Sequence, residues 1–383
     1  MLAVLAGVLS GLAKTARLPE LLLAGRFIFG LSNTNGINLA IMYLTEIVPY
    51  YCVVQINPLY LLSQPTILGD EAHWPLLVAI PAIPALLLAC CLPFFPRSPR
   101  FLLITLQRPE DARKSAEFFM SKSAASAELE RMEMEATEIQ REPNEKAASF
   151  RTLLSSAELR RALLVAFVAT AANQLSSGVL FVYSTEVFEQ AGVPSVQAGP
   201  ASIGIGVFST VAALPSTYLI EAVGRRKLKG DLMGNLCLGL GLGFHSPLLL
   251  SQLVGMLASL CLITLFLFLH PFLQLPWASY GVVAGVWIFF AAWAVGACVA
   301  WVIASELFSQ KYRSKAVGLC TSTTWLCIFL VITVYFPFQR AIGVEYSFLP
   351  LIVLKVLCIV VLTLWLPETC NRPIDEIVAT FRR

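Results

Sequence analysis

The sequence predicts an all-α integral membrane protein with a fold of two helical bundles, the first of them incomplete. Its 383 residues are 57% hydrophobic and 13% charged, whereas about a quarter of the residues of a soluble protein are charged. The charges gather in one central segment, residues 97–161, between two apolar parts. Motifs also recur in the same order in both parts, as a duplicated bundle would leave them. About nine to ten membrane spans are therefore expected.

The first apolar part, residues 1–96, predicts a partial bundle, because a membrane-spanning helix needs about 20 apolar residues. One of its spans is weak, since Gln55, Asn57 and Pro58 interrupt the apolar sequence. The span Leu2–Ala13 is short, but the side chains of Lys14 and Arg17 at its end could extend to the membrane surface. The expected spans are Leu2–Ala13, Leu21–Pro49, the weak Tyr51–Leu68 and Trp74–Phe95.

The central segment, residues 97–161, predicts a cytoplasmic linker with short amphipathic helices. Apolar positions such as Phe118, Leu129 and Met132 recur at helical spacing among alternating acids and bases. Twelve of the chain's Lys and Arg residues fall in this segment. An excess of basic residues marks the cytoplasmic side of a membrane protein.

The second apolar part, residues 162–366, predicts a six-helix bundle, followed by a cytoplasmic tail over residues 367–383. Residues 230–252 look like an insertion, which we expect to lie along the cytoplasmic interface or bend back into the bilayer. A second crossing there would place Lys311–Lys315 outside, against the positive-inside rule. The expected spans are Ala162–Phe188, Ala198–Ala222, Leu253–His270, Trp277–Leu307, Ala316–Phe338 and Tyr346–Leu366.

The two apolar parts repeat one order of motifs. Thr45-Glu46-Ile47 ends one span and Ser305-Glu306-Leu307 ends another. Each is followed by two further spans and then by a proline-containing box, Pro96-Arg97-Ser98-Pro99-Arg100 or Pro367-Glu368-Thr369. This layout is typical of a two-bundle membrane transporter.

Composition argues against several other functions. The net charge is only +3, and the basic residues are not interleaved with aromatic ones, so nucleic acid is not an expected partner. The ten cysteines are scattered without a CxxC motif, and His73, His245 and His270 lack the spacing of metal ligands. No set of nucleophile and base points to an enzyme. We expect neither a metal nor another cofactor.

Short motifs follow one another along nearly the whole chain. They are Gly25-Arg26-Phe27, Pro96-Arg97-Ser98-Pro99-Arg100-Phe101-Leu102-Leu103, Gln174-Leu175-Ser176 with Tyr183-Ser184-Thr185, Glu221-Ala222-Val223-Gly224-Arg225-Arg226, Trp301 with Glu306-Leu307-Phe308-Ser309-Gln310 and Arg313, and Pro367-Glu368-Thr369 with Asp375-Glu376-Ile377. As an ordered set they resemble the facilitative sugar (glucose) transporters of the major facilitator superfamily. The resemblance implies twelve helices, of which this chain has counterparts of the third, the fourth, a remnant of the fifth, and the sixth to the twelfth.

Several positions depart from the family's pattern. Ser209 stands where the family's eighth helix has Asn, and Trp293 aligns with a Glu of its tenth helix. Thr324 and Ile328 stand where Asn is expected in the eleventh helix. Ser209, Trp293 and Ile328 thus replace the polar groups that the resemblance implies in the region of the sugar.

A sugar is bound by hydrogen bonds to its hydroxyls and by aromatic faces against its C–H surface. Asn173 and Gln174 lie near the middle of an otherwise apolar span, and they either line a cavity or form hydrogen bonds between helices. The resemblance adds Ser209, Trp301, Thr324 and Trp325 as sugar-binding candidates. For the tryptophans the alternative is packing, and for the hydroxyls it is a bond to their own helix.

The resemblance also implies a salt-bridge network that joins helix ends on the cytoplasmic side. Its candidate members are Glu46, Arg97, Glu221, Arg225, Arg226, Glu306 and Arg313. The alternative is ordinary anchoring of basic residues at the cytoplasmic surface.

Two functions remain in competition. The first is facilitated transport of a glucose-like hexose by alternating access, in the plasma membrane as the resemblance implies. No carboxylate sits in the middle of a span, which favours passive movement; Lys355, the one base well inside a span, either snorkels or partly lines the cavity. The second is a non-transporting or splice-truncated relative that acts only through interactions. Because polar groups are lost, we expect hexose uptake to be weak or absent.

Overall fold

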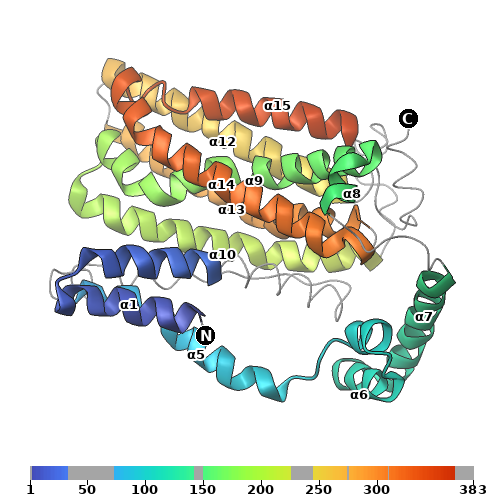
Figure 1. Cartoon of the computed structure of the whole chain (residues 1–383). Coiled ribbons are helices and arrows are strands. Elements are labelled where there is room, and N and C mark those ends of the chain that lie inside the picture. The colour runs from blue at the N-terminus through green and yellow to red at the C-terminus, as the bar shows by residue number, and fades with distance from the viewer. Residues whose placement is uncertain are drawn as a thin grey trace. The chain divides into compact units, whose positions relative to one another are not determined.

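The computed structural model describes residues 2–32, 73–141, 150–225, 245–273, 276–308 and 310–366 (Figure 1). Within these ranges the regular elements are all helices. The described residues up to 141 form one compact unit, and those from 150 onward form a second. The expected span Tyr51–Leu68 and most of Leu21–Pro49 lie outside the described residues.

Apolar helices of the first unit pack through small residues. They are α1 (Leu2–Ala16), a helix over residues 19–32, α4 (Trp74–Ala79) and α5 (Ala82–Cys91), followed by the short η1 (Leu92–Phe94). A Cβ atom added to Gly7 would lie 2.6 Å from Ala82 Cβ, and one added to Gly25 would collide with the Ser10 hydroxyl. Gly25, the first residue of the Gly-Arg-Phe motif, therefore serves close helix contact. The expected span Trp74–Phe95 is interrupted at Ile80 and Pro81, in agreement with a kink at proline.

The polar helices of the first unit have a small core of their own. They are η2 (Phe101–Thr105), α6 (Pro109–Phe119) and α7 (Lys122–Arg141). Leu102, Leu103, Ala112 and Met132 are buried together, with Leu129 packed against them. The proline-containing box is fastened to α6, because Ser115 Oγ donates a 2.5 Å hydrogen bond to the Arg97 carbonyl.

The second unit is a bundle of long helices around α9. Its elements are α8 (Phe150–Ser155), α9 (Ala157–Gln190), α10 (Ser195–Arg225), α12 (His245–Leu273), α13 (Pro276–Glu306), α14 (Gln310–Ile342) and α15 (Leu349–Trp365). α9 packs against α10, α13, α14 and α15, so it lies at the centre of the bundle (Figure 1). The turn after α9 uses Gly192 at φ +87°, a conformation that favours glycine.

The start of α12 differs from the expectation. We predicted a helix from Leu253, but α12 already begins at His245, so residues 245–252 are not part of an irregular insertion. The polar Gln252 is accommodated because its Nε2 donates a 3.0 Å hydrogen bond to the Trp293 carbonyl on α13. Pro247 lies in the first turn, where a helix tolerates proline. Residues 226–244 lie outside the described ranges.

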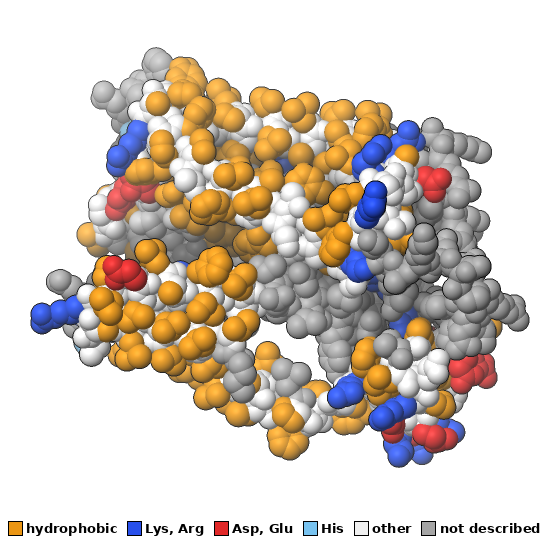
Figure 2. Space-filling model, viewed as in Figure 1, with side chains coloured by type: hydrophobic (Ala, Val, Ile, Leu, Met, Phe, Trp, Pro, Cys, Tyr) orange, Lys and Arg blue, Asp and Glu red, His pale blue; other side chains and the backbone are white. Residues whose placement is uncertain are grey.

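Five of the described helices are long and apolar enough to cross a membrane. These spans are Ala157–Gln190, Ser195–Ala213, Leu249–His270, Trp277–Gly296 and Tyr312–Ile342, and Leu349–Trp365 is a shorter apolar helix. Large apolar side chains such as Leu326, Leu330 and Val353 are exposed on the outer faces of the second unit. Figure 2 shows hydrophobic side chains covering the viewed face of α14 and α15, with Lys and Arg gathered beside α8. Lipid, rather than water, suits such a surface.

Candidate functional site

Asn173 is the most unusual polar residue in the middle of α9. Its side chain is fully buried, and neither Oδ1 nor Nδ2 has a hydrogen-bond partner among the described residues. The neighbouring Gln174 is half-buried, and its Oε1 accepts a long 3.4 Å bond from Ser177 Oγ. A buried amide without partners costs about 1–3 kcal/mol. Such a group calls for an explanation, of which a bound ligand is one.

Thr324 on α14 joins α14 to α9. It is fully buried, and its Oγ1 lies 3.0 Å from Thr170 Oγ1, which also bonds to the Ala166 and Phe167 carbonyls of its own helix. The sequence had offered Thr324 as a sugar ligand and did not identify Thr170. In the structure the Thr324 hydroxyl already has a partner between the helices.

Trp325 follows on α14 with a different environment. Its ring packs beside the buried cluster of Ala171, Leu175 and Ile328. Its Nε1 is buried and has no hydrogen-bond partner among the described residues. Asn173 and Trp325 therefore place unused buried hydrogen-bonding groups on two helices that pack together.

The contact between α9 and α14 continues beyond this point. Gly178 allows a close approach, since a Cβ added there would lie 3.0 Å from Ile328 Cγ2. One and a half turns further on, Tyr183 Oη donates a 3.2 Å hydrogen bond to the Ile332 carbonyl. The Tyr183 ring also stacks with Tyr335 at 5.6 Å between centroids. The segment that holds Asn173 and Gln174 is thus fixed against α14 on both sides.

The remaining sugar-binding candidates are placed less favourably. Ser209 on α10 donates its hydroxyl to the Gly206 carbonyl at 3.1 Å, the bond to its own helix that we had given as the alternative. The side chain of Trp301 lies outside the described part of the structure. Thr324 and Trp325 thus pack on α9 beside Thr170, Ala171 and Leu175, in the same stretch of the helix as Asn173 and Gln174, whereas Ser209 has no such contact among the described residues.

Trp293 occupies the position that the resemblance aligns with a glutamate. It is 9% exposed and packs against Phe181 and Phe290, with ring centroids 5.6 Å and 6.2 Å away. Aromatic packing replaces a charged group at this position of α13, which removes a possible sugar ligand.

The cytoplasmic salt-bridge network stays a prediction. Glu46 and Arg226 lie outside the described residues, as do the side chains of Glu221, Arg225 and Glu306. Arg97 is exposed in the first unit, and Arg313 is half-buried in the first turn of α14. Within the described ranges, no group of three or more His, Cys, Asp or Glu residues could hold a metal ion.

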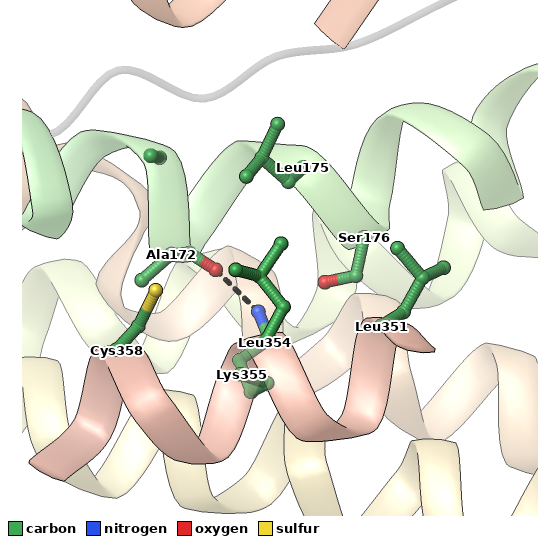
Figure 3. Close-up of a pocket in the computed structure, with 8 residues that line it drawn as sticks. Ala172, Leu175, Ser176, Leu351, Leu354, Lys355 and Cys358 are labelled. Carbon is green, nitrogen blue, oxygen red and sulfur yellow. Dashed lines mark hydrogen bonds between the residues drawn. The ribbon is translucent and has the colours of Figure 1, made fainter. Parts of the chain in front are cut away.

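A small cavity lies between α9 and α15, beside Lys355. Its volume of about 10 Å³ is enough for one water molecule and far too small for a hexose. Ala172, Ser176, Leu351 and Cys358 are among its lining residues. Lys355 does not snorkel: it is 3% exposed, and its Nζ donates a hydrogen bond to the Ala172 carbonyl (Figure 3). The sequence marked Lys355 as unusual but could not reveal this partner.

Comparison with known proteins gives one consistent family. Residues 60–381 match the family model described as "Sugar (and other) transporter". Solute carrier family 2, facilitated glucose transporter member 4 of Mus musculus is 34% identical over 397 residues, covering 100% of this chain and 72% of that protein. Member 1 of Gallus gallus is 32% identical over 397 residues, covering 100% of this chain and 75% of that protein.

The fold resembles that of a solved transporter. The major facilitator superfamily proton:xylose symporter XylE, bound to 6-bromo-6-deoxy-D-glucose, superposes with a TM-score of 0.72. The two are 18% identical, and the match covers 99% of this chain and 82% of that one. At this identity the likeness supports the fold alone.

Proposed function

The chain belongs to the sugar (and other) transporter family, and from this premise we propose that it carries a glucose-like hexose across a membrane by facilitated transport. It is an integral membrane protein of the major facilitator type rather than an enzyme. Such carriers work by alternating access, in which two helical bundles rock about a central binding site. By its family we place the protein in the plasma membrane.

The observation that supports a hexose best is the buried amide of Asn173, which has no hydrogen-bond partner in the described part of the chain. An asparagine amide offers two donors and two acceptors, and the hydroxyls of a hexose can match both kinds. Gln174, one residue on, is half-buried and only weakly bonded, so it can turn toward the same ligand. Trp325, on the helix α14 that packs against α9, adds an aromatic ring and an N–H group that has no partner among the described residues.

Passive movement fits the charges better than proton coupling. The sequence has no Asp or Glu in the middle of the expected spans. Proton-coupled carriers rely on titratable groups inside the membrane. Lys355, the one base well inside a span, is held by a backbone carbonyl.

The second possibility is slow transport or none. It is favoured because several side chains that could bind a sugar already have other contacts. Thr324 bonds to Thr170, Ser209 bonds to its own helix, and Trp293 is packed among aromatic rings. The hydroxyls of Thr324 and Ser209 would otherwise be available to a sugar, and Trp293 stands where the resemblance aligns a glutamate. We therefore propose a carrier of low affinity; a relative without transport is the competing alternative.

Uptake of labelled D-glucose and D-fructose into proteoliposomes tests this proposal. The full chain should give saturable uptake that unlabelled D-glucose inhibits and L-glucose does not. Gln174→Ala should reduce the uptake about tenfold, the effect of losing a substrate hydrogen bond of roughly 1.4 kcal/mol. Ser209→Ala, the matched control, should leave it within about twofold. Folded protein without saturable uptake would favour the non-transporting alternative.

A further inference from the structure

Lys355 is a buried basic residue that hexose transport by itself does not explain. It lies on the inner face of α15, one turn after Leu351 and one turn before Cys358, all three of which are buried. Its side chain is 3% exposed, and most of the residues around it are apolar. Burying an ammonium group is expensive unless it is paired and fully hydrogen-bonded.

The partners of Lys355 are few. Its Nζ donates to the Ala172 carbonyl on α9, and it makes a weak 3.9 Å contact with Met256 Sδ on α12. An ammonium group has three donors, and the structure gives Lys355 no carboxylate partner among the described residues. The strongest contact of Lys355 Nζ is thus with the backbone of α9.

That contact falls beside the proposed sugar ligands. Ala172 immediately precedes Asn173 and Gln174, and its carbonyl belongs to the peptide group that leads into Asn173. Ser176, one turn on, lines the same cavity, and its Oγ has no hydrogen-bond partner among the described residues. Figure 3 shows Lys355 and Ser176 directing their polar atoms into the space between α9 and α15. The cavity is too small for a sugar, so Lys355 does not touch the substrate there.

We propose that Lys355 is a positioning residue for sugar binding, which rests on the proposed function. Its ammonium group holds the Ala172 carbonyl and so sets the direction in which the next two residues, Asn173 and Gln174, present their amides. A charge placed at this point can act on the amides only through the backbone of α9. Its removal should therefore change the affinity for the sugar and spare the stability of the bundle.

The proposal is testable because it predicts a loss of sugar affinity without a loss of stability. Lys355→Met keeps the length of the side chain and removes the charge, and replacing a buried charge by an apolar group is often neutral or stabilising. We expect the KM for D-glucose to rise about fivefold, the size of effect that a coupled residue produces. The maximal rate should stay within about twofold, and the melting temperature should be equal to or higher than that of the wild type.

Two further variants separate positioning from packing. Lys355→Gln keeps a donor on a shorter side chain and should give a KM between those of the wild type and Lys355→Met. Cys358→Ala alters the same cavity without removing the ammonium group and should leave KM unchanged. An unchanged KM in Lys355→Met would overturn the proposal. So would a raised KM that accompanies a lowered melting temperature, since that pattern indicates a packing role. A wild-type chain without saturable uptake would instead refute the proposed function, and the positioning role with it.

Discussion

Different buried side chains of α9 have different roles: one set is placed to bind a ligand, and another holds the bundle together. Asn173 has no partner among the described residues, whereas Thr170 and Thr324 have each other. The sequence predicted that Asn173 and Gln174 lie inside a span. It could not distinguish the roles of Asn173 and Thr324, because these roles depend on which groups the neighbouring helices bring within about 3 Å of each other. The same reason explains why the partners of Gln252 and Lys355 were not predicted.

Asn173→Leu should therefore stabilise the protein while it impairs transport. The substitution replaces an unpaired amide by an apolar group of similar size, so the free energy of unfolding should rise by about 1 kcal/mol. Hexose uptake should fall at least about tenfold, because a ligand hydrogen bond is lost. Thermal unfolding in detergent and uptake in proteoliposomes measure the two effects. A destabilised Asn173→Leu variant would show that the amide has a structural partner.

Thr324→Val should have the reverse pattern. It removes the hydroxyl that bonds to Thr170 and keeps the shape of the side chain, so stability should fall while uptake changes little. A double-mutant cycle with Thr170→Val should give a coupling energy of about 0.6 kcal/mol, the average for interhelical hydrogen bonds in membranes. Zero coupling, or a loss of uptake as large as that of Gln174→Ala, would indicate that Thr324 binds the sugar.

The described helices from α9 onward follow the order of the expected spans, but the ends of these helices were not predictable. Hydropathy located α9, α10, α13, α14 and α15, because an apolar run long enough to cross lipid is a strong signal. The start of α12 was wrong by eight residues, from Leu253 to His245. Glycine and polar residues suggested an irregular segment there. The Gln252 side chain instead bonds to α13, a tertiary contact that the sequence of α12 does not contain.

Glycine at the contact between α9 and α14 should be difficult to replace. A Cβ added at Gly178 would lie 3.0 Å from Ile328 Cγ2. Gly178→Leu should therefore separate the helices and destabilise the protein by about 1–3 kcal/mol. Gly318→Ala on α14 is the matched control, since nothing lies within 4 Å of its added Cβ. The control should be neutral or stabilising by up to about 1 kcal/mol. Equal melting temperatures for both variants would contradict this packing.

The two-bundle fold is a property of the whole set of helices and of the basic residues between them. Repeated motifs and the distribution of basic residues predicted a two-bundle transporter fold, and the family and structural matches confirm that fold. Most of the tertiary contacts could not be predicted, since hydropathy gives the spans but not the faces that meet. α12 is one continuous helix from His245 to Leu273, which agrees with a single crossing at this point.

Cysteine labelling should place Ser314 and Val196 on opposite sides of the membrane. Both positions are exposed, Ser314 near the start of α14 and Val196 near the start of α10. A membrane-impermeant thiol reagent should label Val196→Cys from outside intact cells, with the native cysteines replaced. Ser314→Cys should react only after the membrane is permeabilised, because the neighbouring Lys311, Arg313 and Lys315 favour the cytoplasmic side. Labelling of both positions from outside would require an additional crossing between them.

Counterflow in proteoliposomes tests hexose transport by alternating access most directly. Vesicles that contain the full chain are loaded with unlabelled D-glucose and diluted into a trace of labelled D-glucose. A carrier that exposes one site to each side in turn should accumulate label transiently above its equilibrium level, however slow its turnover. Lys355→Met should keep this overshoot but require more unlabelled sugar to reach it. Correctly folded protein that gives no overshoot with D-glucose, at any loading concentration, would contradict the account.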